Sequence, residues 1–268
     1  MSADAGFIVT EANMKTYLTT ILLAAAALTM PAADQSSTPA PAALARDIRL
    51  ERYVEPRFPL RFRNTTTNEG YAQAQLLVAA DGRIVECFVS AYSHQEFAAA
   101  VEQAVQGWLF RASEPAVAGA LPQRFNVRFN FRREGMVVIQ GDVQETVRSF
   151  FNQKDSDTSV APCKLRDLDN TPEPVTLIVP AYPEELKMQG IEGGAAVSFF
   201  IDEQGRVRTP SVAGTTRPEF AAAALEAVGK WTFAPPRRKG QPTRVFAVQE
   251  FSFSPGSATT SVTSKPAN

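Results

Sequence analysis

Apolar and polar side chains alternate in several segments of the second half of this chain. Residues 195–201 alternate with a period of two, which predicts a strand, and residues 206–212 are expected to form the returning strand after the turn at 202–205. The pattern Thr216-x-x-Glu219 is typical of a capping box, and the apolar positions that follow recur every three or four residues up to Trp231, which predicts a helix. Residues 245–253 alternate once more. The predicted order is strand, strand, helix, strand.

The first half of the chain shows the same succession of patterns. Residues 72–78 alternate, Asp81-Gly82 marks a turn, Ser93-x-x-Glu96 predicts a capping box, and a helix is expected over 97–108. The alternation continues in a last strand, residues 124–132. One face of that strand is expected to pack on the helix and the other to meet water, because its polar face carries Arg124, Asn126, Arg128, Asn130 and Arg132.

An offset of 123 residues relates the two halves. It carries Gly82 to Gly205 and Phe97 to Phe220, and it superimposes the only two tryptophans of the chain. A repeat of this kind fixes the architecture. We therefore predict an α+β protein with two tandem small ββαβ domains, each a three-stranded antiparallel sheet packed on one helix. Six residues are predicted to be structural: Trp108, Trp231, Phe97, Phe220, Gly82 and Gly205.

The N-terminus has the features of an export signal. Lys15 precedes an uncharged run of 15 residues, Thr16 to Met30, and small residues follow. As a helix this run spans about 22 Å, less than the roughly 30 Å of a hydrocarbon core, which favours cleavage over a permanent anchor. We expect residues 1–33 to be a signal peptide, with the true start at Met14, and the mature protein to be periplasmic. An uncleaved inner-membrane anchor is the alternative.

The remaining boundaries follow from composition. Residues 34–45 are rich in Pro, Ala, Ser and Thr, and residues 255–268 are Ser/Thr-rich, so a disordered linker and a disordered tail are expected. The first domain is predicted at 46–135 and the second at 175–254. Residues 136–174 between them are predicted to be a linker that begins with a strand and a short helix.

Charge and residue chemistry argue against several classes of function. The 27 basic and 28 acidic residues nearly cancel, which gives no field to attract nucleic acid. One histidine, His94, and two distant cysteines do not supply a typical zinc site, and His94 is expected in a helix cap. We expect no enzyme activity, cofactor, metal or small-molecule substrate. Cys87 and Cys163 either pair as a disulfide after export or remain free, and both readings stay open.

A family resemblance rests on the second half. The phrases Pro180-Ala181-Tyr182-Pro183, Ile201-Asp202-Glu203-Gln204-Gly205 and Ala227-Val228-Gly229-Lys230-Trp231-Thr232-Phe233 together resemble the C-terminal domain of TonB, over roughly Val179 to Phe253. The first half resembles it more loosely, with Phe58-Pro59 where the second half has Tyr182-Pro183.

The resemblance implies a domain that binds a short peptide of outer-membrane transporters by adding a strand to its sheet. The open edge of a three-stranded sheet can accept such a strand. By analogy the partner-binding residues are Tyr182, Pro183, Arg244, Phe246, Val248 and Glu250. The expected partners are other envelope proteins, including TonB-dependent outer-membrane receptors, and a homodimer is a further expectation.

Two departures from the family bear on function. The apolar N-terminal run has no histidine, and the spacer 34–45 reaches only about 37 Å even in an extended polyproline form. These departures favour a periplasmic binding module over a TonB-type energy transducer anchored in the inner membrane. An envelope structural protein is the third hypothesis.

Overall fold

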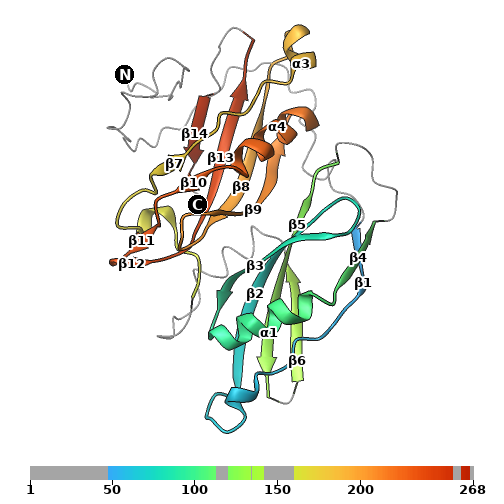
Figure 1. Cartoon of the computed structure of the whole chain (residues 1–268), viewed down its shortest axis with the longest axis vertical. Helices are drawn as coiled ribbons and strands as arrows, with labels where there is room; N and C mark the ends of the chain where they lie inside the picture. Colours follow the sequence, from blue (N-terminus) through green and yellow to red (C-terminus); the bar gives the residue numbers. More distant parts are fainter. Residues whose placement is uncertain (1–47, 113–119, 134, 142–159, 256–260, 266–268) are drawn as a thin grey trace.

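The structure is a computed structural model, and it describes residues 48–112, 120–133, 135–141, 160–255 and 261–265. The predicted signal peptide, the linker 34–45 and the predicted short helix after residue 141 lie outside the described residues. Two four-stranded antiparallel sheets dominate the described part of the chain, together with three α-helices. We call residues 48–141 the N-terminal unit and residues 160–265 the C-terminal unit. Figure 1 shows the two units following one another along the long axis of the molecule.

In the N-terminal unit the sheet has the order β3-β2-β5-β6, and α1 packs against β2 and β3. A separate two-stranded sheet pairs β1 with β4. The elements are β1 (Ile48–Arg52), the 3-10 helix η3 (Leu60–Phe62), β2 (Glu69–Val78), β3 (Ile84–Tyr92), α1 (Gln95–Val105), β4 (Leu109–Ala112), β5 (Gln123–Arg132) and β6 (Gly135–Gly141).

The C-terminal unit has the same arrangement. Its sheet has the order β14-β13-β8-β9, α4 packs against β8 and β9, and β7 pairs with β10. The elements are the 3-10 helix η4 (Leu165–Asp167), β7 (Pro174–Thr176), α3 (Glu184–Met188), β8 (Gly193–Ile201), β9 (Val207–Thr215), α4 (Pro218–Val228), β10 (Thr232–Phe233), β11 (Arg237–Arg238), β12 (Gln241–Pro242), β13 (Val245–Phe253) and β14 (Ser261–Lys265).

The glycines at the equivalent turns have a physical reason. Gly82 has φ +89° and Gly205 has φ +80°, a region that residues with a side chain rarely adopt. Both also lie against backbone, since a Cβ at Gly82 would be 2.3 Å from the Phe110 carbonyl oxygen and one at Gly205 would be 1.8 Å from that of Phe233. Turn conformation and close packing therefore require glycine at both positions.

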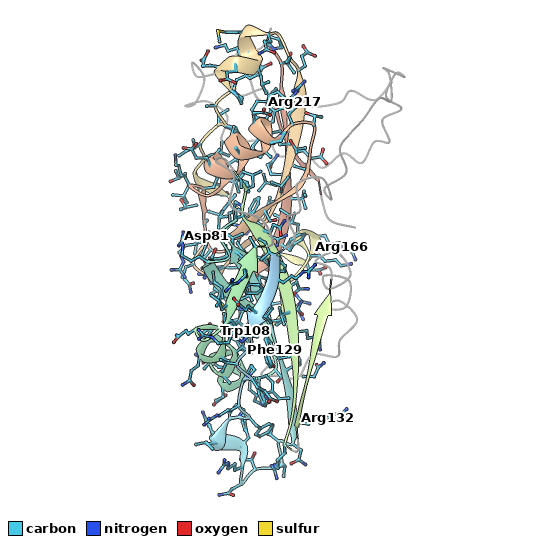
Figure 2. All side chains as sticks on the ribbon, turned by 90° about the vertical axis from the view of Figure 1, so that its right-hand side faces the viewer. Asp81, Trp108, Phe129, Arg132, Arg166 and Arg217 are labelled. Carbon is cyan, nitrogen blue, oxygen red and sulfur yellow. The ribbon has the colours of Figure 1, made fainter. Side chains whose placement is uncertain are left out.

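The two tryptophans occupy equivalent places. The indole Nε1 of Trp108 donates to the Val54 carbonyl and that of Trp231 to the Ile178 carbonyl, each at 2.8 Å. Both rings are buried in the core between helix and sheet, and Figure 2 shows Trp108 beside Phe129 in the N-terminal unit. These bonds satisfy the one polar atom of each buried indole.

The predicted capping boxes do not form. The N-cap residues are His94 and Arg217, and neither side chain makes a cap hydrogen bond. Ser93 Oγ instead accepts from the Tyr71 amide, and Thr216 Oγ1 accepts from the Gly194 amide, both at 3.0 Å. Each hydroxyl therefore ties the start of its helix to the neighbouring strand.

Each unit has its own core between helix and sheet. The buried side chains of the N-terminal core include Phe97, Val101, Phe129 and Phe131, and those of the C-terminal core include Phe199, Phe220, Val228 and Phe251. Part of the predicted linker belongs to the second core, because Cys163 is buried there and Leu165 and Leu168 pack against it.

Two predictions about the sheets are wrong. Both sheets have four strands, because β6 pairs with β5 and β14 pairs with β13. The predicted disordered tail contains β14, which the polar composition of residues 261–265 did not indicate, since backbone pairing with a neighbouring edge needs no apolar pattern.

The solvent-exposed outer face predicted for β5 is also wrong in part. Asn126 is buried, and Arg124 reaches the C-terminal unit. β9 of the C-terminal unit lies against β2, β3 and β5 of the N-terminal unit. The outer faces of the two sheets therefore meet at these strands. Arg132, at the other end of β5, is exposed and lies far from this contact in Figure 2.

Candidate functional site

The outer face of the predicted docking strand β13 is packed inside the molecule. Phe246 is buried, its ring lies 5.1 Å from that of Phe200, and Phe200 lies 5.6 Å from Phe88 of the N-terminal unit. Val248 packs against the same three rings. Phe246 and Val248 therefore join the two units and do not present a free surface to a partner.

Three arginines surround these rings. Arg124 lies 5.7 Å from the Phe200 and Phe246 ring centres, Arg208 lies 4.6 Å from that of Phe88, and Arg244 lies 5.2 Å from that of Phe88. Cations over aromatic faces are attracted by the ring quadrupole. We call the three rings and three arginines the joint: Phe88, Phe200, Phe246, Arg124, Arg208 and Arg244.

Arg244, a predicted partner-binding residue, is held within the joint. Its Nε donates to Glu203 at 2.6 Å, its Nη1 donates to the Val89 carbonyl, and its ring contacts extend to Tyr92. Its own carbonyl accepts from the Cys163 amide at 2.8 Å. The side chain therefore has a structural role between the units.

Tyr182 and Pro183 hold the entrance to the C-terminal unit. The Tyr182 hydroxyl donates to the Ile191 carbonyl at 2.6 Å, and its ring lies 5.8 Å from both Phe220 and Phe253. Pro183 directly precedes α3. These contacts explain the Tyr-Pro pair by folding alone, and the structure does not test a further role in binding.

The edge of β13 that was predicted to be open is covered. Cys163 pairs with Val245 at the start of the strand, and β14 pairs with residues Val248 to Ser252 in antiparallel register. Glu250 is the predicted binding residue whose side chain stays exposed, and it stands opposite Thr263 of β14. The prediction of a free edge is therefore wrong for the structure as it stands.

On β9, the opposite edge strand of this sheet, the backbone of Thr209 is bonded to the N-terminal unit. The Thr209 amide donates to Glu86 Oε2 and the Thr209 carbonyl accepts from Arg124 Nη1, both at 2.8 Å. Thr209 has φ +44° at a bulge in β9, and Pro210 has no amide hydrogen. Glu86 and Arg124 thus fill the positions that the backbone of a neighbouring strand would take.

The joint contains buried charge. Arg124 Nη2 also donates to Ser198 Oγ at 2.6 Å, while its buried Nε has no hydrogen-bond partner among the described residues. Desolvation lowers the pKa of Arg124 to about 10, so it stays charged at neutral pH. Burial opposes the charge of Arg208, but the carboxylates of Glu86 and Asp202 outweigh it and raise the pKa of Arg208.

Sequence reasoning also missed a polar cluster on the outer face of the first sheet. Asn126 Oδ1 accepts from Gln73 Nε2 at 2.6 Å and from Gln75 Nε2 at 3.0 Å, and Ser90 Oγ accepts from Gln75 at 3.3 Å. All four side chains are buried. Their alternation with apolar residues is typical of a water-facing strand, so no local signal could have revealed this burial.

The two cysteines are free thiols in the structure. Cys87 packs against the N-terminal core and Cys163 is buried in the C-terminal core, which favours the reading without a disulfide. Burial, and secondly Glu102, raise the pKa of the Cys87 thiol to about 12. Neither thiol is activated as a nucleophile.

Neither a metal-binding group nor a membrane-spanning helix occurs in the described part of the chain. Its His, Cys, Asp and Glu side chains form no group of three that could hold a metal ion. His94 packs its ring 5.0 Å from Phe62 and 5.9 Å from Phe97. None of the helices in the described residues has the length and apolar character needed to span a membrane.

Comparison with known families agrees with the fold of the C-terminal unit. Residues 179–255 match the family described as Gram-negative bacterial TonB protein C-terminal. The match includes β8, β9, α4 and β13 and ends before β14. No curated protein matches the chain. The match covers 77 of the 268 residues of the chain, all of them in the C-terminal unit.

Proposed function

We propose that this chain is a periplasmic, TonB-like protein-binding component of the Gram-negative envelope that takes part in outer-membrane transport and has no catalytic activity. The observation that carries the proposal is the family match over residues 179–255, which includes strands β8, β9 and β13 and helix α4 of the C-terminal unit. The nearly neutral net charge and the two unactivated thiols are consistent with binding of protein.

The N-terminal unit is proposed to be a diverged second copy of the same domain. The supporting observations are the equal sheet orders, the glycines at 82 and 205, and the two tryptophan hydrogen bonds, all at equivalent places. Since its outer face is packed on the C-terminal unit, we expect this copy to serve as a scaffold and the C-terminal unit to bind partners.

The proposed binding mode is backbone pairing with the C-terminal sheet. Arg244 and Phe246 belong to the joint and Val248 packs against its rings, so the side chains of these three residues are not proposed to contact a partner. The proposed contact is the backbone of Val248 to Ser252, with the exposed Glu250 carboxylate beside it. Backbone pairing gives affinity, and alternate side chains give specificity.

A photo-crosslinking experiment in the native host tests this function. A photoreactive residue at Glu250 is expected to crosslink to TonB-dependent outer-membrane receptors identified by mass spectrometry. The matched control is the same residue at Glu226, an exposed position on α4 that pairs with Lys230 and lies away from β13. Equal crosslinking from both positions, or none to an outer-membrane receptor, would contradict the proposal.

N-terminal sequencing of the exported protein separates the binding module from an anchored energy transducer. A mature start near Asp34 supports the periplasmic module, whereas retention of residues 16–30 supports the transducer.

A further inference from the structure

We propose that β14 is a replaceable strand, which occupies the β13 edge until an extended segment of a partner protein takes its place. This inference rests on the proposed function, because it names how the partner reaches the sheet. The residues of β14 lie beyond the family match, which ends at residue 255. The strand that we propose to be replaced therefore lies outside the matched residues.

The composition of β14 indicates that it binds the edge of β13 weakly. Its sequence, Ser-Val-Thr-Ser-Lys, contains one apolar residue, so its attachment depends mainly on backbone hydrogen bonds to Val248–Ser252. A partner segment can form the same backbone hydrogen bonds. Any apolar side chain that it adds against the core then favours the partner over β14.

The equivalent strand of the N-terminal unit provides an internal contrast. β6 reads Gly-Met-Val-Val-Ile-Gln-Gly, pairs with β5 over Asn126 to Arg132, and follows β5 after two residues. β14 follows β13 only after residues 254–260. A longer connection lowers the effective concentration of a strand at its edge. The chain therefore has one firmly attached strand and one exchangeable strand at equivalent edges.

Two other positions on the edges of the C-terminal sheet are already bonded within the chain. Thr209 of β9 is bonded to Glu86 and Arg124, and those two residues lie within the interface between the units. At the start of β13, the Cys163 amide donates to the Arg244 carbonyl from inside the core. The proposed exchangeable stretch is Val248–Ser252, the residues that pair with β14.

The register of β14 indicates what the partner segment should contain. Val262 stands opposite Phe251, which is buried on the helix side, so an apolar residue suits that position. Thr263 stands opposite the exposed Glu250. A Lys or Arg of the partner at the position of Thr263 would form an ion pair with the Glu250 carboxylate. The partner is therefore an extended segment with an apolar residue followed directly by a basic one.

The probe is a fluorescent peptide of residues 259–267. The receptor is the chain shortened to end at Ser254, which lacks β14. The truncated chain is expected to bind the peptide at least about tenfold more tightly than the full chain, where the attached strand competes. The peptide with Thr263→Lys should bind more tightly still. A peptide with Val262→Pro and Thr263→Pro should not bind. In an antiparallel pair only every second residue bonds its amide to the neighbouring strand, so prolines at two adjacent positions remove one of these bonds in either register.

A second variant tests the proposal independently of whether the truncated chain folds. The full chain with Val262→Pro and Thr263→Pro keeps its length and should bind the wild-type peptide as the truncated chain does. The matched control is the full chain with Val262→Ala and Thr263→Ala, which keeps both backbone amides. Unchanged fluorescence of the two tryptophans, Trp108 and Trp231, in all variants verifies the fold.

The outcomes separate this proposal from the proposed function. If neither opened variant binds the peptide while both are folded, or if they form exchanged dimers instead, the replaceable strand is excluded. If they bind the peptide but crosslink from Glu250 to no outer-membrane receptor, the edge is exchangeable and the proposed function fails.

Discussion

The thiol of Cys87 couples the stability of the N-terminal unit to pH. Cys87 lies on β3 facing α1, and burial raises its pKa from 9.0 to about 12, with Glu102 adding to the effect. Because the folded pKa is raised, the neutral thiol stabilises the fold fully below pH 9. That contribution is lost as the pH rises through about 12.

The corresponding prediction concerns the Cys87→Ala variant. Between pH 9 and 11, the free energy of unfolding of the wild type should fall more steeply than that of the variant, by at most about 1.4 kcal/mol per pH unit. Urea unfolding at a series of pH values measures both slopes, and titration of Lys and Tyr affects both proteins alike. Parallel slopes would show that the thiol is not desolvated.

The role of a single residue could be predicted from the sequence where it depends on local backbone conformation. Gly82 and Gly205 were identified from their turns, because a positive φ selects glycine whatever lies around it. Arg124 and Phe246 were misplaced, because their alternation indicates only which face of a strand they occupy. What covers that face depends on the other unit.

At the scale of elements, the structure contrasts two edge strands of unequal strength. Amides of β14 are expected to exchange with solvent at least about 100-fold faster than those of β6, because β14 has one apolar residue in five and a long connection. Native-state hydrogen exchange with mass spectrometry measures both segments in one sample. Amides of β8, paired on both sides, serve as the slow reference. Equal protection of β14 and β6 would contradict a weakly attached strand.

The same contrast explains which elements the sequence could predict. Strands β2, β8 and β13 and helices α1 and α4 bury one apolar face, so periodicity gives their existence and their order. β14 has no such face. Its position follows from the free backbone of β13, which is a property of the assembled sheet and leaves no pattern in residues 261–265.

At the scale of the whole molecule, the joint turns two units into one body. Rings from both units meet, and Glu86 bonds the β9 backbone. Arg124 donates three hydrogen bonds into the C-terminal unit, to the Ser198 carbonyl and hydroxyl and to the Thr209 carbonyl. Separation of the units would expose the rings and leave these groups without partners. We therefore expect the wild type to unfold in a single cooperative transition.

The Arg124→Ala variant tests this coupling. Loss of the guanidinium leaves buried acceptors unsatisfied, so the variant should lose about 3 kcal/mol and unfold in two transitions. Arg128→Ala is the matched control, because Arg128 lies four residues further along β5 on the same face but stays within its own unit, where it bonds Asn130 and covers the Tyr71 ring. Its unfolding should remain a single transition. Urea unfolding followed by tryptophan fluorescence and small-angle X-ray scattering distinguishes the two variants, and equal behaviour of both would exclude Arg124 as the residue that joins the units.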